Sequence, residues 1–155
     1  MAVRLVIFDC DGVLIDSELI SARMLVAELA QLGVAIDLDY VARHFLGRSY
    51  PVVMAQIRRD FHLDLPDDFE ARYRARLLAS FVTDLRVMPG VAGVIADLAV
   101  PFCVATSSSP QRAAMSLGIV GLGHLVGPQL FTASMVERGK PAPDLFLHAA
   151  AQMGA

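Results

Sequence analysis

Two aspartates, Asp9 and Asp11, follow an apolar run at the start of the chain and are separated by one residue. Two carboxylates this close destabilise each other in a low-dielectric site unless a cation or hydrogen-bond donors compensate them. A hard ion that prefers oxygen ligands, such as Mg²⁺, is a natural compensator. Gly12, which follows, lets the backbone turn sharply and approach a ligand. Taken alone, the pattern also fits a strand that ends in turn-forming acids.

Two further groups have the chemistry of an anion site. Thr106, Ser107 and Ser108 offer hydroxyls and backbone N–H groups at the expected start of a helix, where the helix dipole favours anions. Lys140, the one lysine of the chain, precedes two prolines in a stiff segment, and its ammonium can neutralise a phosphate or an aspartate. Each group also has an ordinary alternative, a helix-capping turn for the hydroxyls and a solvated loop residue for the lysine.

The elements that must position these residues alternate between strands and helices. This order predicts an α/β fold, a Rossmann-like parallel sheet with right-handed crossovers that binds ligands at the carboxyl ends of its strands. Asp9, Thr106 and the segment leading to Lys140 each follow a predicted strand, so we expect them to meet at one edge of the sheet. The predicted strands are 2–8, 102–105 and 129–132, and the predicted helices are 91–98, 110–117 and 144–153.

The stretch between the first strand and the rest of the sheet predicts an inserted all-helical domain, because its apolar residues recur at helical spacing and no convincing strand is present. Ser17 is a candidate cap for the first of these helices, and Asp37 or Asp39 for a second one. The predicted helices include 17–32, 50–61 and 67–81.

Composition narrows the class of protein. The chain has 155 residues, 55% of them hydrophobic, and a net charge of −3, which supports a packed core and gives no electrostatic reason to expect nucleic-acid binding. No apolar run approaches the roughly 20 residues of a membrane span, and the N-terminus does not have the pattern of a signal peptide, so we expect a cytoplasmic protein without a membrane partner. Cys10 and Cys103 are expected to be buried thiols rather than a disulfide.

Taken together and in this order, these segments resemble the haloacid dehalogenase superfamily. Residues 8–18 resemble its first motif, Asp-x-Asp-x-[Thr/Val], Thr106 its second and residues 139–144 its lysine-containing third motif. The resemblance is greatest to the branch of β-phosphoglucomutase-like sugar phosphatases, which includes 6-phosphogluconate phosphatase-like proteins. It implies a core formed by residues 1–15 and 87–155 and an α-helical cap formed by residues 16–86.

The resemblance also implies a role for each residue of the site. Asp9 would attack phosphorus and form an aspartyl-phosphate, and Asp11 would act as general acid and then as general base. Mg²⁺ would bind a carboxylate oxygen of Asp9 and the backbone carbonyl of Asp11. Thr106 and Lys140 would hold the phosphoryl oxygens, and substrate contacts would come from Gly12, Ser107 and Ser108.

In the expected cap, His44, Gly47 and Arg48 are the candidates for substrate specificity, because related caps place a substrate-binding loop around such a glycine. The planar fork of Arg48 suits a sugar carboxylate or hydroxyls. The alternatives are an ordinary surface arginine and a histidine without a ligand.

The function that these motifs imply is a Mg²⁺-dependent phosphatase acting on a small phosphorylated metabolite, a sugar phosphate or a sugar-acid phosphate. One alternative is a phosphomutase, but mutases of this branch carry a histidine at the position of Ser21. Another is a catalytically silent binding protein. Its support is that no acidic residue follows Asp144, so the family's fourth motif, an acidic pair that supplies a further Mg²⁺ ligand, has no match.

We therefore expect the 155 residues to come from a longer protein, with another element covering the edge of the first strand as the alternative. We expect the chain by itself to bind Mg²⁺ weakly and to show little or no turnover. A phosphatase assay on the 155-residue chain checks this expectation. A kcat in the ordinary range of enzymes, about 1–10³ s⁻¹, would contradict it.

Overall fold

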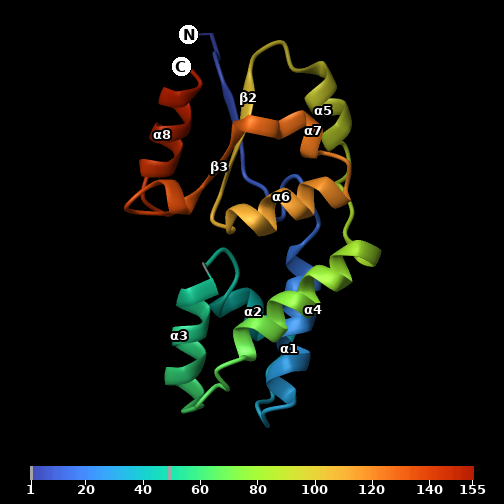
Figure 1. Ribbon diagram of the computed structural model, residues 1–155, viewed down its shortest axis with the longest axis vertical. Helices are drawn as coiled ribbons and strands as arrows, with labels where there is room; N and C mark the ends of the chain where they lie inside the picture. The colour runs from blue at the N-terminus through green and yellow to red at the C-terminus, as the bar shows by residue number, and fades with distance from the viewer. Residues whose placement is uncertain (1, 49) are drawn as a thin grey trace. The chain divides into compact units, whose positions relative to one another are not determined.

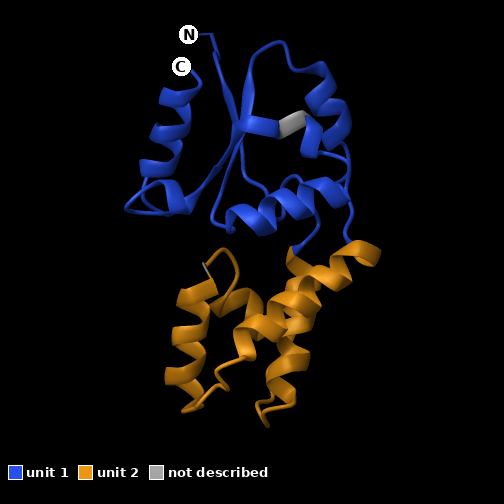
Figure 2. Ribbon diagram, viewed as in Figure 1, with its two compact units in different colours: residues 1–17, 85–155 blue, residues 18–84 orange. Residues whose placement is uncertain are grey.

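The computed structural model describes residues 2–48 and 50–155, without the side chains of residues 125 and 126. The chain divides into two compact units, residues 1–17 with 85–155 and residues 18–84 (Figure 2). Among the helices of the described residues, none is long and apolar enough to span a membrane.

The first unit contains a three-stranded parallel sheet with the strand order β1-β2-β3 (Figure 1). Parallel neighbours need crossover connections, which here include helices, as the alternating sequence pattern predicts. The sheet lies between α8 on one side and α5 and α6 on the other (Figure 1). The strands are β1 (Val6–Phe8), β2 (Phe102–Thr106) and β3 (Leu130–Thr132); the helices are α5 (Val91–Asp97), α6 (Pro110–Ile119), α7 (Gly123–Val126) and α8 (Asp144–Gln152), with short 3₁₀ turns at Gly127–Gln129 and Ala133–Met135.

The first strand begins later than its apolar sequence predicts, since residues 2–4 are exposed and the strand starts at Val6. Val6 pairs with Phe102, and its N–H donates to the carbonyl of Pro101. Proline has no N–H to return a hydrogen bond, so the ladder ends there. The central strand β2 is buried from Cys103 to Thr106, as expected for a strand covered on both faces.

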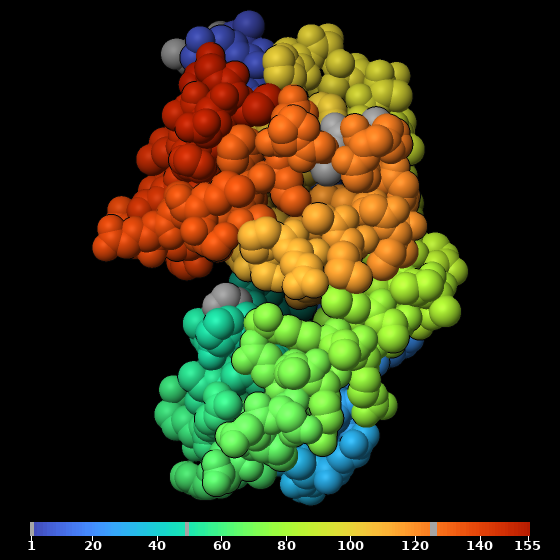
Figure 3. Space-filling model, viewed as in Figure 1, coloured from blue at the N-terminus to red at the C-terminus, as the bar shows by residue number. Residues whose placement is uncertain are grey.

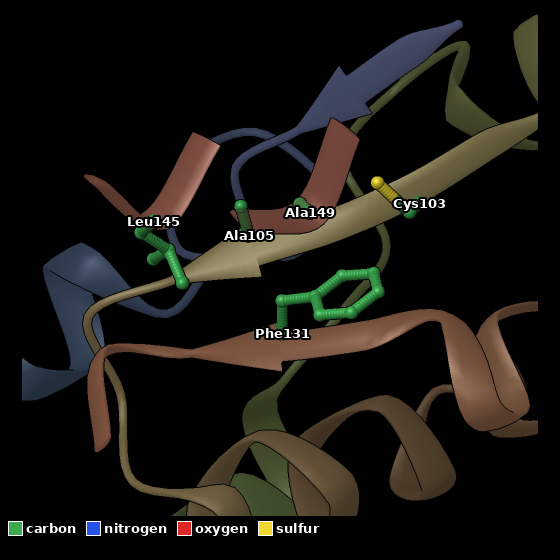
Figure 4. Close-up of a cluster of buried hydrophobic side chains, with 5 residues drawn as sticks. All are labelled: Cys103, Ala105, Phe131, Leu145 and Ala149. Atoms are coloured by element: carbon green, nitrogen blue, oxygen red, sulfur yellow. The ribbon is translucent and has the colours of Figure 1, made fainter. Parts of the chain in front are cut away.

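Helix α8 packs on the sheet through a small apolar cluster. Leu145 and Ala149 of the helix lie against Cys103, Ala105 and Phe131 of the strands (Figure 4). Leu145 and Ala149 are fully buried and lie four residues apart, on one helix face. In the space-filling view, α6, α8 and the segment before α8 form much of the visible surface of this unit (Figure 3).

The second unit contains four helices in the described residues, with α1 packed against both α2 and α4. Asp37 caps α2 by accepting a 2.7 Å hydrogen bond from the N–H of Tyr40, which decides between the two predicted caps. An ion pair between Arg76 and the buried Glu28 joins α4 to α1. The helices are α1 (Glu18–Ala30), α2 (Leu38–His44), α3 (Tyr50–Phe61) and α4 (Phe69–Asp84).

Replacing Leu145 by alanine tests the packing of α8. Leu145 is 0% exposed and Leu147 on the same helix is 65% exposed. We expect Leu145→Ala to lower the free energy of unfolding of the first unit by about 2–5 kcal/mol, because it removes transfer energy and leaves a cavity. Leu147→Ala is the matched control and should change the free energy of unfolding by less than about 0.5 kcal/mol. Urea unfolding followed by circular dichroism measures both, and equal effects would contradict the packing described.

Candidate active site

Asp9 follows the last residue of β1 and meets Lys140, which follows β3. The Nζ of Lys140 lies 2.9 Å from Oδ1 of Asp9 and donates a 2.8 Å hydrogen bond to the carbonyl of Ala105 in β2. The backbone N–H of Cys10 also donates to Oδ1 of Asp9, at 2.7 Å. Within the described residues, Oδ2 of Asp9 has no hydrogen bond or ion pair, and the side chain is 44% exposed. One oxygen is therefore held, and the other is open to a ligand.

Asp11 lies in a different environment, because three side chains donate to its carboxylate. Ser17 and Arg112 donate to Oδ1, with the Arg112 distance at 3.0 Å, and Ser108 donates to Oδ2 at 2.7 Å. The Asp11 side chain is 25% exposed and that of Arg112 is 30% exposed. The carboxylate is thus fixed in orientation and partly withdrawn from water.

Ser17 and Arg112 are site residues that the sequence reasoning missed. Ser17, a predicted helix cap, is fully buried and uses its hydroxyl on Asp11. Arg112 stands in the first turn of α6, where the helix dipole disfavours a positive charge. An arginine at that position is the sequence signal that an acidic partner lies near.

The hydroxyl segment after β2 has the expected form of a strand-to-helix turn. Thr106 is buried, and its Oγ1 accepts a 3.1 Å hydrogen bond from the N–H of Ser108. Ser109 is the N-cap of α6, and Pro110 stands in the first turn. Because Ser108 also donates to Asp11, this turn and the loop after β1 are joined at the same edge of the sheet.

The loop after β1 turns back on itself directly after the two acids. Gly12 has a φ of +75°, a conformation that glycine adopts without steric cost. Its N–H donates to the carbonyl of Ile15 at 2.8 Å, and the carbonyl of Cys10 accepts from the N–H of Leu14 at 2.9 Å. These bonds hold the backbone around Asp11.

The segment that carries Lys140 is braced on both sides. Arg138 forms a two-bond ion pair with Asp144 at 2.8 and 2.9 Å, closing the segment around the lysine. The ammonium of Lys140 also lies 5.1 Å from the centre of the Phe146 ring in α8. The lysine side chain, 17% exposed, is therefore directed toward Asp9 by its contacts with β2 and α8.

Of the three residues of the second unit that were expected to contact substrate, His44 and Arg48 have side-chain contacts inside that unit. His44 packs on Tyr40 with ring centres 4.3 Å apart, and Gly47 has a φ of +73°. Arg48 donates a 3.1 Å hydrogen bond to the side-chain carbonyl of Gln56. Their role in substrate binding stays a prediction.

The donor set after β1 fits a hard cation in part. Asp9 offers a carboxylate oxygen, and the carboxylate of Asp11 is taken by its three donors, so Asp11 has its backbone carbonyl to offer. Among residues 2–48 and 50–155, no group of three or more histidine, cysteine, aspartate or glutamate side chains is arranged to hold a metal ion. Both oxygens are of the type that Mg²⁺ prefers.

Comparison with known proteins shows the family to which the chain belongs. The haloacid dehalogenase-like hydrolases match residues 3–155 of the chain. The chain belongs to this family. The resemblance inferred from the sequence and the predicted α/β fold are both confirmed.

Individual proteins of this family are similar to the chain in sequence and in fold. The chain is 28% identical over 152 residues to 6-phosphogluconate phosphatase of Escherichia coli K12, covering 97% of this chain and 69% of that protein. A haloacid dehalogenase-like protein of Agrobacterium tumefaciens superposes with a TM-score of 0.84 at 32% identity, over 99% of this chain and 70% of that one. A hydrolase of the same family from Deinococcus radiodurans, solved with phosphate and sodium bound, superposes with a TM-score of 0.73 at 33% identity. The match covers 97% of this chain and 67% of that one. The chain spans about two thirds of the length of each of them.

Cys10 lies between the two acids, and we expect its thiol to be unreactive. Burial, followed by the charges of Asp11 and Asp9, raises the pKa of the Cys10 thiol to about 12. A raised pKa favours the protonated form, so at pH 8 the Cys10 thiol is almost entirely protonated and a poor nucleophile. In a Cys103→Ala variant, Ellman's reagent at pH 8 should leave the native protein unmodified and label Cys10 after unfolding in urea.

Burial also raises the pKa of the Cys103 thiol. Cys10→Ala, which retains Cys103, is therefore the matched variant. Its remaining thiol should likewise be labelled by Ellman's reagent only after unfolding in urea. Rapid labelling of native Cys10 would contradict the burial and charge described.

Proposed function

We propose that the protein is a Mg²⁺-dependent phosphatase that hydrolyses a small phosphorylated metabolite through a phosphorylated Asp9. The observation that carries the proposal is the contact between Lys140 and one oxygen of Asp9, which leaves the second oxygen open. The family and the phosphatase among the relatives support the same reaction class. The substrate class that we propose is a sugar phosphate or a sugar-acid phosphate.

In the first half of the proposed reaction, the open oxygen of Asp9 attacks phosphorus. A bond forms between that oxygen and phosphorus, and the bond between phosphorus and the leaving oxygen breaks. Protonated Asp11 gives its proton to the leaving oxygen, so that an alcohol departs. The donors around Asp11 then stabilise the carboxylate that remains.

In the second half, Asp11 takes a proton from a water molecule while the water oxygen attacks the phosphorus of the aspartyl-phosphate. The bond from phosphorus to Asp9 breaks, inorganic phosphate is released, and Asp9 returns as a carboxylate. Asp11 again carries the proton with which the cycle began. One residue thus serves as acid and as base, which suits a carboxyl group that its neighbours hold in place.

The phosphoryl group needs cationic and hydrogen-bonding partners on its other oxygens. Lys140 supplies a positive charge beside Asp9, and we propose that the hydroxyl of Thr106 and the N–H of Ser107 donate to the phosphoryl oxygens. Gly12 and Ser108, in the turns beside the two acids, are the further substrate-contacting residues of this proposal.

We propose that Asp9, through a carboxylate oxygen, and Asp11, through its backbone carbonyl, hold the metal. When bound, Mg²⁺ would screen the negative charge of the phosphate from the attacking carboxylate. We further propose that residues 16–86 act as a cap that shapes substrate choice, with His44, Gly47 and Arg48 as its substrate-reading residues. The hydrogen bond from Arg48 to Gln56, and that from Gln56 to Asp60 at 3.0 Å, support a directed guanidinium at this position.

Replacing Asp9 by asparagine tests the proposal. We expect Asp9→Asn to reduce phosphate release from a panel of sugar phosphates and sugar-acid phosphates by at least about 10³-fold, because an amide does not replace the nucleophilic carboxylate. The measurement is colorimetric phosphate release by the complete protein with Mg²⁺. Beryllium trifluoride, a mimic of the phosphoryl group, should give a bound ¹⁹F signal with the native protein and none with the variant.

Asp16→Asn is the matched control, since Asp16 is an exposed acid of the same loop with no part in the proposed site. It should release phosphate at the native rate. Native activity in Asp9→Asn, or the absence of phosphate release from every member of the panel by the native protein, would overturn the proposed function.

A further inference from the structure

The ion pair between Arg112 and Asp11 joins the start of α6 to the loop after β1. Nη2 of Arg112 lies 3.0 Å from Oδ1 of Asp11, across 101 residues of sequence. Both side chains are more than two-thirds shielded from solvent, so the attraction is screened less than that of an exposed surface pair. The contact belongs to the first unit alone.

The start of α6 fixes the position of this guanidinium. The Ser109 side chain accepts a hydrogen bond from the backbone N–H of Arg112 at 3.4 Å, and Pro110 begins the helix. A positive charge this close to a helix N-terminus is unfavourable by itself. The carboxylate of Asp11 compensates it, and the arginine in turn holds that carboxylate.

The donors divide the two oxygens of Asp11 between them. Oδ1 accepts from Arg112 and from Ser17, whereas Oδ2 accepts from Ser108. A hydrogen bond from a charged donor is the strongest of the three and requires a lone pair on its acceptor. Oδ2 does not face the guanidinium and accepts from the neutral hydroxyl of Ser108.

We propose that Arg112 is a positioning residue for the reaction, which holds Oδ1 of Asp11 and so keeps Oδ2 for proton transfer. The inference rests on the proposed function, in which Asp11 passes a proton to the leaving oxygen. Without the guanidinium, the carboxyl group loses its charged donor and keeps the hydroxyls of Ser17 and Ser108, so delivery of its proton to the leaving oxygen becomes less frequent. The attack of Asp9 on phosphorus does not depend on Arg112.

This division predicts a dependence on the leaving group. An alkoxide must be protonated as it leaves, whereas 4-nitrophenolate leaves without a proton. Loss of a positioned general acid should therefore slow the release of the leaving group from alkyl phosphates selectively. A residue that binds the substrate phosphate would instead affect both kinds of substrate and raise KM.

The test uses the complete protein, Mg²⁺, 4-nitrophenyl phosphate and the alkyl phosphate that the panel above shows is hydrolysed fastest. We expect Arg112→Gln to lower the single-turnover rate of leaving-group release about 10- to 100-fold for the alkyl phosphate and less than about threefold for 4-nitrophenyl phosphate, because only this first half of the reaction differs between the two substrates. KM should change little for either substrate. Arg112→Lys, which keeps the charge, should recover part of the loss on the alkyl phosphate.

Asp11→Asn is the reference and should show the same selectivity at a greater magnitude. Arg72→Gln is the control, because it removes an exposed arginine–aspartate ion pair of the second unit. Equal losses on both substrates, a raised KM at unchanged kcat, or native rates in Arg112→Gln would overturn the inference and leave the proposed function standing. If the native protein hydrolyses no alkyl phosphate, the proposed function fails and the inference fails with it.

Discussion

The compensation of two neighbouring carboxylates at the end of β1 is the constraint on which the rest of the site depends. Each acid has its own cation, Lys140 for Asp9 and Arg112 for Asp11, at 2.9 and 3.0 Å. Partly buried carboxylates this close in sequence would otherwise repel each other and destabilise the fold at this point. Because the cations come from different elements, the acids are stable as a pair only when the whole sheet edge is assembled.

The parallel sheet is what brings these distant residues together. With β2 in the centre, the loops after β1 and β3 both lie next to its carboxyl end, and Lys140 uses the carbonyl of Ala105 in β2 as a second anchor. The packing of Leu145 against Ala105 fixes α8, and the ion pair of Arg138 with Asp144 ties the lysine segment to that helix. The stability of the core and the position of the ammonium therefore have the same source.

The sequence was sufficient for the features that follow from local pattern. The spacing of apolar residues, together with the glycines, prolines and capping residues between segments, predicted the parallel sheet and most of its helices. The bounds of α3 are those predicted from the spacing of its apolar residues. The sequence did not predict where the first strand begins, because that point depends on its hydrogen bond with Pro101 in another segment. Arg112 and Ser17 were missed for the same reason: an isolated arginine or serine carries no periodic signal, and its partner is set by the tertiary fold.

The number of donors on each acid supports a division of labour between them. Asp9 has both of its donors on one oxygen, so the other retains the lone pairs that a nucleophile needs. Asp11 has donors on both oxygens, which makes it a poor nucleophile and a well-oriented acid or base. Two residues of the same type, two positions apart, are thus suited to different steps by their neighbours. In the proposed reaction, the chemistry of the site is decided less by the acids than by the arginine, lysine and serines around them.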